Sequence, residues 1–141
     1  MTDTTEAQEK PASTPPRVLP YDLLGGDAAI RSLAAAFYKA MTELPEAQTI
    51  RAMHKEDLSE IEEKLYEYLS GWLGGPHHYL KKYGTVCLTT PHAPYPIGAA
   101  ERDQWLLCMD KALNDIGASE EVKTMVKKPF FAIAEMMRNR D

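Results

Sequence analysis

The chain has 141 residues, of which 44% are hydrophobic and 26% are charged, a composition typical of one soluble domain. The formal net charge of −5 argues against a nucleic-acid partner, because such proteins carry a broad basic surface. No run of about 18 apolar residues occurs, so the sequence predicts no membrane partner and no membrane span. The chain starts without the apolar core of a secretory signal, and its two cysteines cannot form a disulfide framework. Both features favour a cytoplasmic location.

The beginning of the chain differs in composition from the rest. Residues 1–19 are rich in proline, serine, threonine, glutamine and glutamate. Such a segment buries too little apolar surface to offset the entropy lost on ordering. The sequence therefore predicts a disordered, proline-rich tail over residues 1–19 and a folded domain over residues 20–141.

Two amphipathic helices are predicted in the first half of this domain. The first begins with Asp27 as its N-cap and ends before Leu44-Pro45, and a short helical turn follows. The second begins at Asp57 or Ser59 and ends at Gly74-Gly75-Pro76, because Gly adopts the left-handed cap and Pro cannot continue a helix. Apolar residues recur in both at steps of three and four. They are Ile30, Leu33, Ala34, Phe37 and Met41, then Leu58, Ile61, Leu65, Leu69 and Trp72.

Two more amphipathic helices are predicted in the second half. One spans residues 99–116 and is stopped by Gly117. The other begins at Ser119, which can cap it, and continues to Met137. No segment shows the alternation of a β-strand, so the pattern predicts an all-α fold of four packed helices.

A long connection separates the second helix from the third. Loops of this length, here residues 74–99, are uncommon in compact domains and are usually functional. The connection holds three of the four histidines: His77, His78 and His92. His92 lies between Pro91 and Pro94, which restrict the backbone and would help to hold an imidazole ligand in one direction. A surface histidine in a turn is the simpler interpretation of this local sequence.

Other sites find less support in the sequence. Four residues could be recruited as zinc ligands: Cys87, Cys108, His77 and His92. They show no CxxC or HxxxH spacing, which disfavours a zinc site. The motifs GxSxG, GxGxxG and the P-loop are absent. Aromatic and methionine side chains on the apolar stripes suit a core and also the wall of a flat aromatic cofactor, and the pattern alone does not separate the two.

Three motifs follow one another along the chain. They are Gly74-Gly75-Pro76-x-x-Tyr79, His92-x-Pro94-x-x-Ile97 and Glu101-Arg102-Asp103-x-Trp105-Leu106-x-Cys108-Met109. With Phe37-Tyr38 before them, the sequence resembles the group II truncated haemoglobins from about Tyr21 to Met137. The resemblance implies an all-α truncated globin, a two-over-two helical sandwich around haem b. The long connection would carry a short helix with the proximal ligand of the iron.

The resemblance also implies roles for individual residues. His92 matches the metal ligand, as imidazole suits haem iron. Tyr38 and Trp105 match distal residues whose O–H and N–H groups can donate hydrogen bonds to bound dioxygen. His54 matches a third distal position, where the family usually has Tyr or Phe.

Further contacts with the cofactor are implied around the haem edge. Leu65 and Ile97 match apolar contacts, and Lys64 and Tyr79 match positions that can reach the haem propionates. The family usually carries one or two arginines just before the proximal histidine. This chain has Thr89-Thr90-Pro91 there, which puts the usual propionate anchor in doubt.

The function implied by the resemblance is binding of dioxygen and other small ligands at haem iron. A polar distal pocket suits ligand stabilisation and also redox chemistry with peroxide or nitric oxide, for which a reductase would be the partner. Enzymatic activity and the oligomeric state are left open. The alternative is a helical interaction module without a cofactor, which would use the proline-rich tail and the apolar helix faces.

Overall fold

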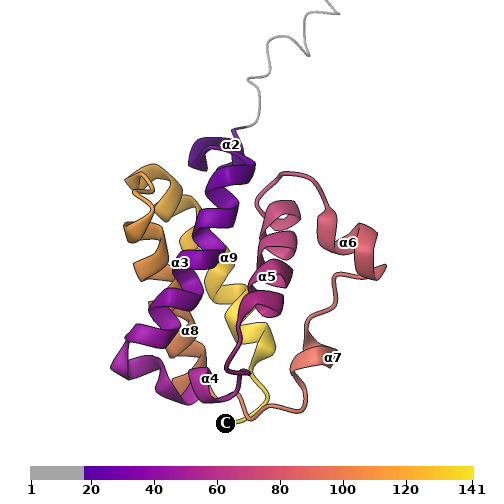
Figure 1. The fold of residues 1–141 in the computed structure, drawn as a ribbon, viewed down its shortest axis with the longest axis vertical. Helices are drawn as coiled ribbons and strands as arrows, with labels where there is room; N and C mark the ends of the chain where they lie inside the picture. Colours follow the sequence, from indigo (N-terminus) through magenta and orange to yellow (C-terminus); the bar gives the residue numbers. More distant parts are fainter. Residues whose placement is uncertain (1–17) are drawn as a thin grey trace, which may run out of the picture.

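The computed structural model describes residues 18–141, and all regular structure within them is helical (Figure 1). The predicted tail lies outside the described residues apart from its last two positions. No helix within residues 18–141 combines the length and apolarity needed to cross a membrane. The elements in chain order are α2 (Pro20–Leu24), α3 (Asp27–Glu43), η1 (Pro45–Ala47), α4 (Gln48–Ala52), α5 (Ser59–Trp72), α6 (His78–Tyr83), α7 (Thr89–His92), α8 (Ala99–Asp115) and α9 (Glu120–Met137).

The four predicted amphipathic helices are confirmed as α3, α5, α8 and α9. Ser119 caps α9 as predicted, since its Oγ accepts a hydrogen bond from the Val122 N–H at 3.2 Å. The prediction of Asp27 as an N-cap was wrong by one residue. Gly26 takes that position, and Asp27, in the first turn of α3, accepts a hydrogen bond from the Tyr66 hydroxyl of α5. The carboxylate thus joins two helices instead of closing the end of one.

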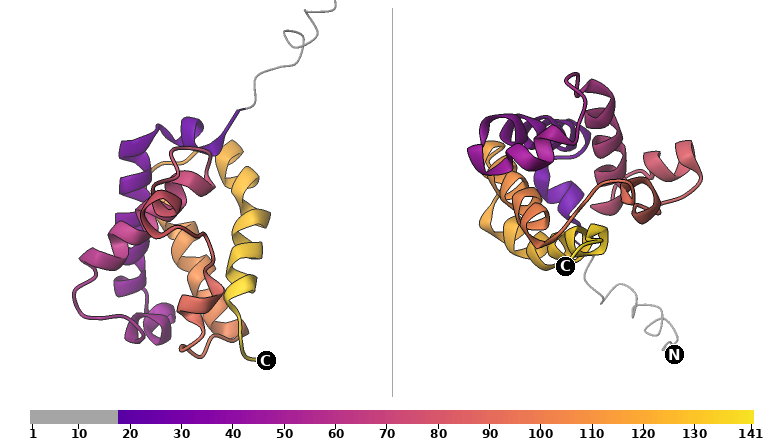
Figure 2. Two further views of the ribbon diagram at one scale, coloured as in Figure 1. Left: turned by 90° about the vertical axis from the view of Figure 1, so that its right-hand side faces the viewer. Right: turned by 90° about the horizontal axis from the view of Figure 1, so that it is seen from below.

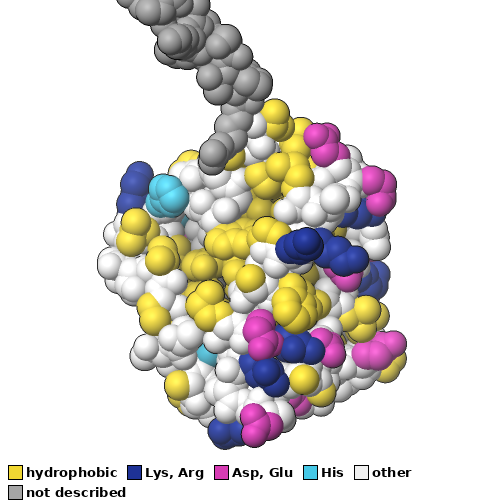
Figure 3. Space-filling model, turned by 180° about the vertical axis from the view of Figure 1, so that it is seen from behind, with side chains coloured by type: hydrophobic (Ala, Val, Ile, Leu, Met, Phe, Trp, Pro, Cys, Tyr) yellow, Lys and Arg dark blue, Asp and Glu magenta, His cyan; other side chains and the backbone are white. Residues whose placement is uncertain are grey.

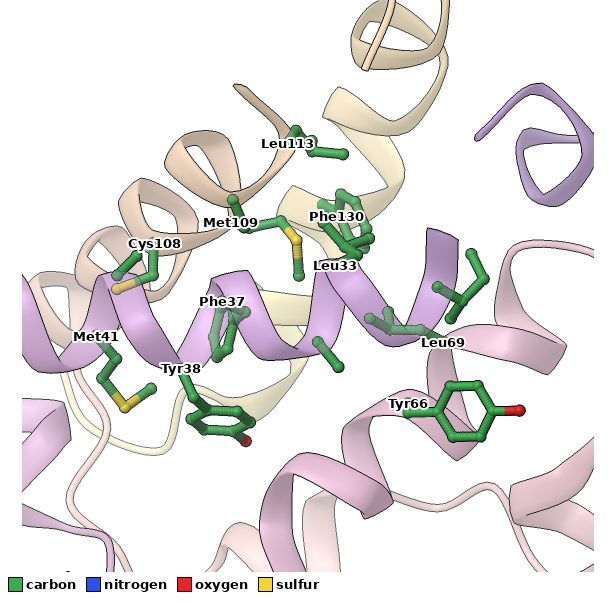
Figure 4. Packing of buried hydrophobic residues seen from close by; sticks show 14 of the residues in the cluster. Leu33, Phe37, Tyr38, Met41, Tyr66, Leu69, Cys108, Met109, Leu113 and Phe130 are labelled. Carbon is green, nitrogen blue, oxygen red and sulfur yellow. The ribbon is translucent and has the colours of Figure 1, made fainter. Parts of the chain in front are cut away.

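The core lies where α3 packs between α5 and α8, with α8 packed in turn on α9 (Figures 1 and 2). This is the two-over-two arrangement of a truncated globin, as predicted. The predicted stripes meet there, and Figure 4 shows Leu33 and Phe37 of α3 beside Met109 of α8 and Phe130 of α9. The Trp72 and Phe130 rings stack at 4.8 Å. Apolar burial of this kind supplies most of the stability of such helices.

The connection between α5 and α8 contains more structure than the sequence indicated. Two short helices, α6 and α7, lie within it, and neither contains a buried residue. The resemblance implied only the helix that carries His92, which is α7. In Figure 2 this connection lies outside the packed helices, alongside α5 and α9. It is therefore placed by hydrogen bonds and by aromatic contacts, such as that of Tyr68 with Tyr79 at 5.5 Å, rather than by full burial.

The glycines that precede this connection allow α5 to end against α2. Gly74 has a φ of +107°, a left-handed conformation that favours glycine. A Cβ at Gly75 would collide with the Tyr21 ring of α2. The Tyr21 N–H also donates to the Leu73 carbonyl at 2.9 Å. The Gly74-Gly75-Pro76 motif thus fixes the direction in which the chain leaves α5.

Candidate functional site

His92 is the last residue of α7, and its ring is held by its own helix. The Nδ1 atom lies 2.6 Å from the Leu88 carbonyl oxygen, one helical turn earlier. A carbonyl oxygen only accepts hydrogen bonds, so Nδ1 carries the proton. In the neutral imidazole this leaves a lone pair on Nε2, which is the arrangement of a histidine prepared to bind a metal.

Tyr38 lies on α3 and presents a donor that the protein itself does not use. Its side chain is 6% exposed, and in Figure 4 the hydroxyl points away from α3. No hydrogen bond joins this hydroxyl to another of the residues 18–141. Burial raises the pKa of the Tyr38 phenol well above its ordinary value, and the nearby charge of Glu62 adds to this. The group therefore stays protonated and remains a hydrogen-bond donor.

Trp105 adds a second donor, from α8. Its ring lies 5.3 Å from the Phe37 ring and 5.9 Å from the Phe130 ring. Phe37 also contacts Tyr38, with ring centroids 5.0 Å apart. Phe37 thus bridges Tyr38 and Trp105. No described residue accepts a hydrogen bond from the Trp105 indole, which can act only as a donor.

His54, beside Tyr38, repeats the hydrogen bonding of His92. Its Nδ1 lies 2.8 Å from the Ile50 carbonyl oxygen, again one turn earlier, and its ring lies 5.7 Å from the Tyr38 ring. Burial lowers the pKa of His54 more than the hydrogen bond to the Ile50 carbonyl raises it, and the nearby charge of Arg51 lowers it further. His54 is thus neutral at pH 7, with a lone pair on Nε2.

The remaining predicted contacts lie along α5 and the connection. Leu65 packs against the core. The Lys64 Nζ atom lies 5.8 Å from the Tyr83 ring centroid, and Tyr79 contacts the same ring at 4.6 Å. No acidic side chain of residues 18–141 forms an ion pair with Lys64. Ile97 lies between α7 and α8, where its backbone is bonded to Asn139.

Apolar surface lies beside Tyr79. A mainly apolar cavity of about 210 Å³ opens between α5 and α6, and its wall includes Tyr68, Trp72, Tyr79 and Val86. Figure 3, which shows the molecule from behind, shows hydrophobic side chains gathered across the middle of that face. A flat apolar group with polar edges would cover such a surface.

These features fit a haem. A histidine with a free Nε2 can supply the axial ligand, two unpaired donors can serve a bound small molecule, and apolar side chains can wall the porphyrin. Within residues 18–141 no three His, Cys, Asp or Glu side chains cluster as a metal site. The fold and the donor set define a haem-binding globin.

The known proteins that this chain resembles belong to the same class. Residues 20–139 match the bacterial-like globin family. The structure superposes with a TM-score of 0.84 on the group II 2-on-2 haemoglobin of the plant pathogen Agrobacterium tumefaciens, at 41% identity over 91% of this chain and 99% of the other. It superposes equally well, at 0.84, on the cold-adapted truncated haemoglobin of the Antarctic marine bacterium Pseudoalteromonas haloplanktis TAC125, at 35% identity over 88% and 100% of the two chains.

A sequence relative gives the same result. The group 2 truncated haemoglobin YjbI of Bacillus subtilis (strain 168) is 30% identical over 104 residues, 74% of this chain and 76% of its own. The chain belongs to the bacterial-like globins and, within them, to the group II truncated haemoglobins. It is a haem b protein of the oxygen-binding globin class.

Some contacts of the site escaped the sequence reasoning. The carbonyl groups of Leu88 and Ile50 fix the two imidazoles, and bonds to backbone carbonyl groups are not revealed by residue type. Asn139 bonds the connection beside His92. No pattern in the sequence pointed to Asn139, because its partners are backbone groups more than 40 residues away.

Proposed function

We propose that this haemoglobin binds dioxygen with His92 as the proximal ligand and retains it through hydrogen bonds from Tyr38 and Trp105. Bound haem supplies the ferrous iron to which small diatomic molecules bind. The observation that carries the proposal is the pair of donors, the Tyr38 hydroxyl and the Trp105 N–H, which have no protein partner in the described part of the chain. Each gains a partner when a ligand with partial negative charge arrives, so each slows its release.

His92 acts in this proposal through a fixed ring orientation. The Leu88 carbonyl accepts the Nδ1 proton at 2.6 Å, so the tautomer that can bind iron through Nε2 is already selected. Such a hydrogen bond also raises the basicity of the ligand. A short helix with a bonded imidazole at its end thus serves as the proximal side.

The haem edge is held, in this proposal, from α5 and α6. Lys64 and Tyr79 both lie beside the Tyr83 ring and present an ammonium and a hydroxyl to the propionates. Leu65 and Ile97 provide apolar contacts. These groups replace the arginines that this family usually places before the proximal histidine, where the present chain has Thr89-Thr90-Pro91.

His54 favours a second function, reaction with hydrogen peroxide. Because its Nδ1 proton is committed to Ile50, its Nε2 atom is an acceptor and offers no donor to dioxygen. Hydrogen peroxide carries protons that such an acceptor can bind or remove. The distal side therefore combines two donors for dioxygen with one acceptor suited to a protonated ligand.

Absorption spectra of the purified protein with haem test the main proposal. We expect an intense Soret band in the ferric and ferrous forms, and a shift on adding carbon monoxide. The His92→Gly variant should lose this ligation, and added imidazole should restore it by filling the space of the missing ring. His78→Gly, in the same connection, is the matched control and should resemble the wild type. An unchanged ferrous spectrum in His92→Gly would remove His92 from this role.

The cell compartment and the redox partner follow from the same proposal. Cys87 and Cys108 are both unpaired thiols, which supports a reducing cytoplasm. Dioxygen binds ferrous iron, so a reductase is needed to return oxidised protein to the ferrous form. Reduction of the ferric protein by a cytoplasmic extract with NADH or NADPH, followed by its spectrum, measures this step.

A further inference from the structure

We propose that Asn139 is a positioning residue for the proximal histidine. Asn139 follows α9 and ties down the backbone of residues 92–97, the turn that leads from His92 to α8. Through this turn it sets the backbone position of His92, while the Leu88 carbonyl orients the ring. The inference rests on the proposed role of His92 as the iron ligand.

The Asn139 side chain uses both ends of its amide in this turn. Its Nδ2 group donates to the Tyr95 carbonyl at 2.9 Å and, more weakly, to the His92 carbonyl at 3.4 Å. Its Oδ1 atom accepts from the Ile97 N–H at 2.9 Å. One side chain therefore bonds the first residue, the middle and the last residue of the turn. Only a carboxamide supplies donors and an acceptor together at this length.

The backbone after α9 adds two more bonds to the same turn. The N–H groups of Asn139 and Arg140 both donate to the Ile97 carbonyl, at 2.8 Å and 3.0 Å. The Ile97 peptide is thus bonded on both sides by the segment after α9. A turn held by this many directional contacts has little freedom to rotate.

Asn139 is itself placed by the folded core rather than by the turn. The Glu135 carboxylate, near the end of α9, accepts from Arg102 of α8 at 2.9 Å and from Arg138 at 3.0 Å. These bonds fix the end of α9 against the start of α8. Arg102 lies on α8, one turn before Trp105. The same helix therefore helps to position the proximal turn and carries a proposed distal donor.

Burial gives this turn little support. No residue of α7 is buried, and Pro94, Tyr95 and Pro96 are exposed. Apolar packing therefore contributes little to the position of His92 in the described structure. The hydrogen bonds of the segment after α9, most of them from Asn139, hold the turn instead.

The test uses the full chain loaded with haem and two variants. Asn139→Leu removes every side-chain bond, and Asn139→Asp keeps the acceptor for Ile97 but replaces the donor by a carboxylate that faces two carbonyl oxygens. Resonance Raman spectra of the ferrous protein report the iron–histidine stretching band. Transfer of haem to an excess of apomyoglobin reports haem retention. We expect a shifted or broadened band and about tenfold faster haem loss in both variants, as for other residues that orient a metal ligand.

Asn114→Leu is the matched control, since Asn114 is an exposed asparagine near the end of α8. It should leave the band and the rate of haem loss at their wild-type values. Far-UV circular dichroism checks that all variants keep their helices, so a shifted band with unchanged helicity separates positioning from general loss of structure. Wild-type bands in Asn139→Leu and Asn139→Asp would overturn the inference.

The failure of the proposed function has a different outcome. If the iron–histidine band of the wild-type protein survives in His92→Gly, the proximal ligand is another residue and the proposal for His92 fails. If the band disappears in His92→Gly and is unchanged in both Asn139 variants, His92 keeps its role and only Asn139 loses it.

Discussion

The four long helices and the connection between α5 and α8 are stabilised by different forces. The helices bury Ile30, Leu33, Phe37, Met109 and other apolar side chains almost completely. The two short helices of the connection bury none, and polar bonds from Ser70, Glu67 and Asn139 hold this segment. Burial is non-directional and tolerant, whereas hydrogen bonds fix positions and directions.

This difference separates the two sides of the proposed haem site. Tyr38 and Trp105 project from the buried helices α3 and α8, so their positions follow from the core. His92 lies on the connection, so its position follows from a few hydrogen bonds. We expect changes in the core to act on global stability, and changes in the connection to act on haem retention.

The largest effect is expected from a core substitution. Leu33 is 0% exposed, and Leu33→Ala removes buried methyl groups and leaves a cavity. Such changes cost about 3–5 kcal/mol of unfolding free energy. Denaturation with urea, followed by far-UV circular dichroism on the haem-loaded protein, measures this loss. Val86→Ala in the connection is the control, because Val86 is 55% exposed and surface substitutions usually change stability by less than about 0.5 kcal/mol.

An equal loss of stability in the two variants would contradict the comparison. It would mean that the connection contributes to the fold as strongly as the core does. A loss of haem from Val86→Ala without a loss of stability would instead agree with it, since Val86 borders the apolar cavity between α5 and α6.

The next effect concerns the distal donors. Tyr38→Phe and Trp105→Phe each remove one donor and keep an aromatic ring in the core. A neutral hydrogen bond contributes roughly 0.5–1.5 kcal/mol, so dissociation of dioxygen should become about two- to tenfold faster for each variant. Stopped-flow measurements give this rate. Haem retention should stay unchanged, because neither residue holds the connection.

The two variants can also be combined. The rate in the double variant should exceed both single rates, since the two donors come from different helices. Dissociation at the wild-type rate in all three variants would remove Tyr38 and Trp105 from the proposed function.

The same contrast decides what the sequence could predict about the fold. Helical periodicity predicts α3, α5, α8 and α9 because each buries one stripe of apolar residues against its neighbours. It does not predict α6, since a short helix without buried residues has no stripe. It also misplaces the cap of α3, where Gly26 stands and Asp27 is used in a bond to Tyr66, a partner distant in sequence.

The functional site was less predictable from the sequence than the four long helices were. Local sequence favoured a surface histidine at position 92, and only the resemblance to a family pointed to it as a ligand. The bonds that orient His92 and His54 involve backbone carbonyl groups, which no residue type reveals. The role of Asn139 could not be predicted for the same reason, because its partners are backbone carbonyl and N–H groups that nearly every residue type offers.

A smaller effect is expected from the contact between α5 and α6. Lys82 forms an ion pair with Glu67 at 3.1 Å, and the Glu67 side chain is only 9% exposed. Lys82→Ala leaves this carboxylate without its cation. Because Lys82 itself is largely exposed, solvent screens the pair, and the loss should be much smaller than that of Leu33→Ala. The unfolding free energy, measured at low and high salt, gives this value.

Lys81→Ala is the matched control for this pair. Lys81 is an exposed lysine of the same short helix and pairs with no acidic side chain in the described range. Its replacement should leave stability unchanged at both salt concentrations. If Lys81→Ala and Lys82→Ala behave alike, the ion pair has no part in holding α6.

The smallest effect on stability, and a clear contrast in chemistry, is expected for the two thiols. Cys87 lies in the connection, exposed, and hydrogen bonds led by that of the Thr89 hydroxyl lower its pKa to about 7. Cys108 lies in the core, where burial raises its pKa to about 11. The thiolate is the reactive form. A lowered pKa places the rise in reactivity at lower pH, so alkylation of Cys87 by iodoacetamide should increase with pH with a midpoint near 7. Cys108 should react only after unfolding.

Two variants assign this reaction to its source. Cys87→Ser should abolish the fast phase of alkylation, and Thr89→Val should move its midpoint to higher pH, because the Thr89 Oγ1 atom lies 3.4 Å from the Cys87 Sγ atom and contributes the leading bond. Mass spectrometry of the alkylated peptides identifies the residue. Alkylation of Cys108 in the folded protein at the rate of Cys87 would show that the core opens as readily as the connection, and the distinction between the two regions would then be lost.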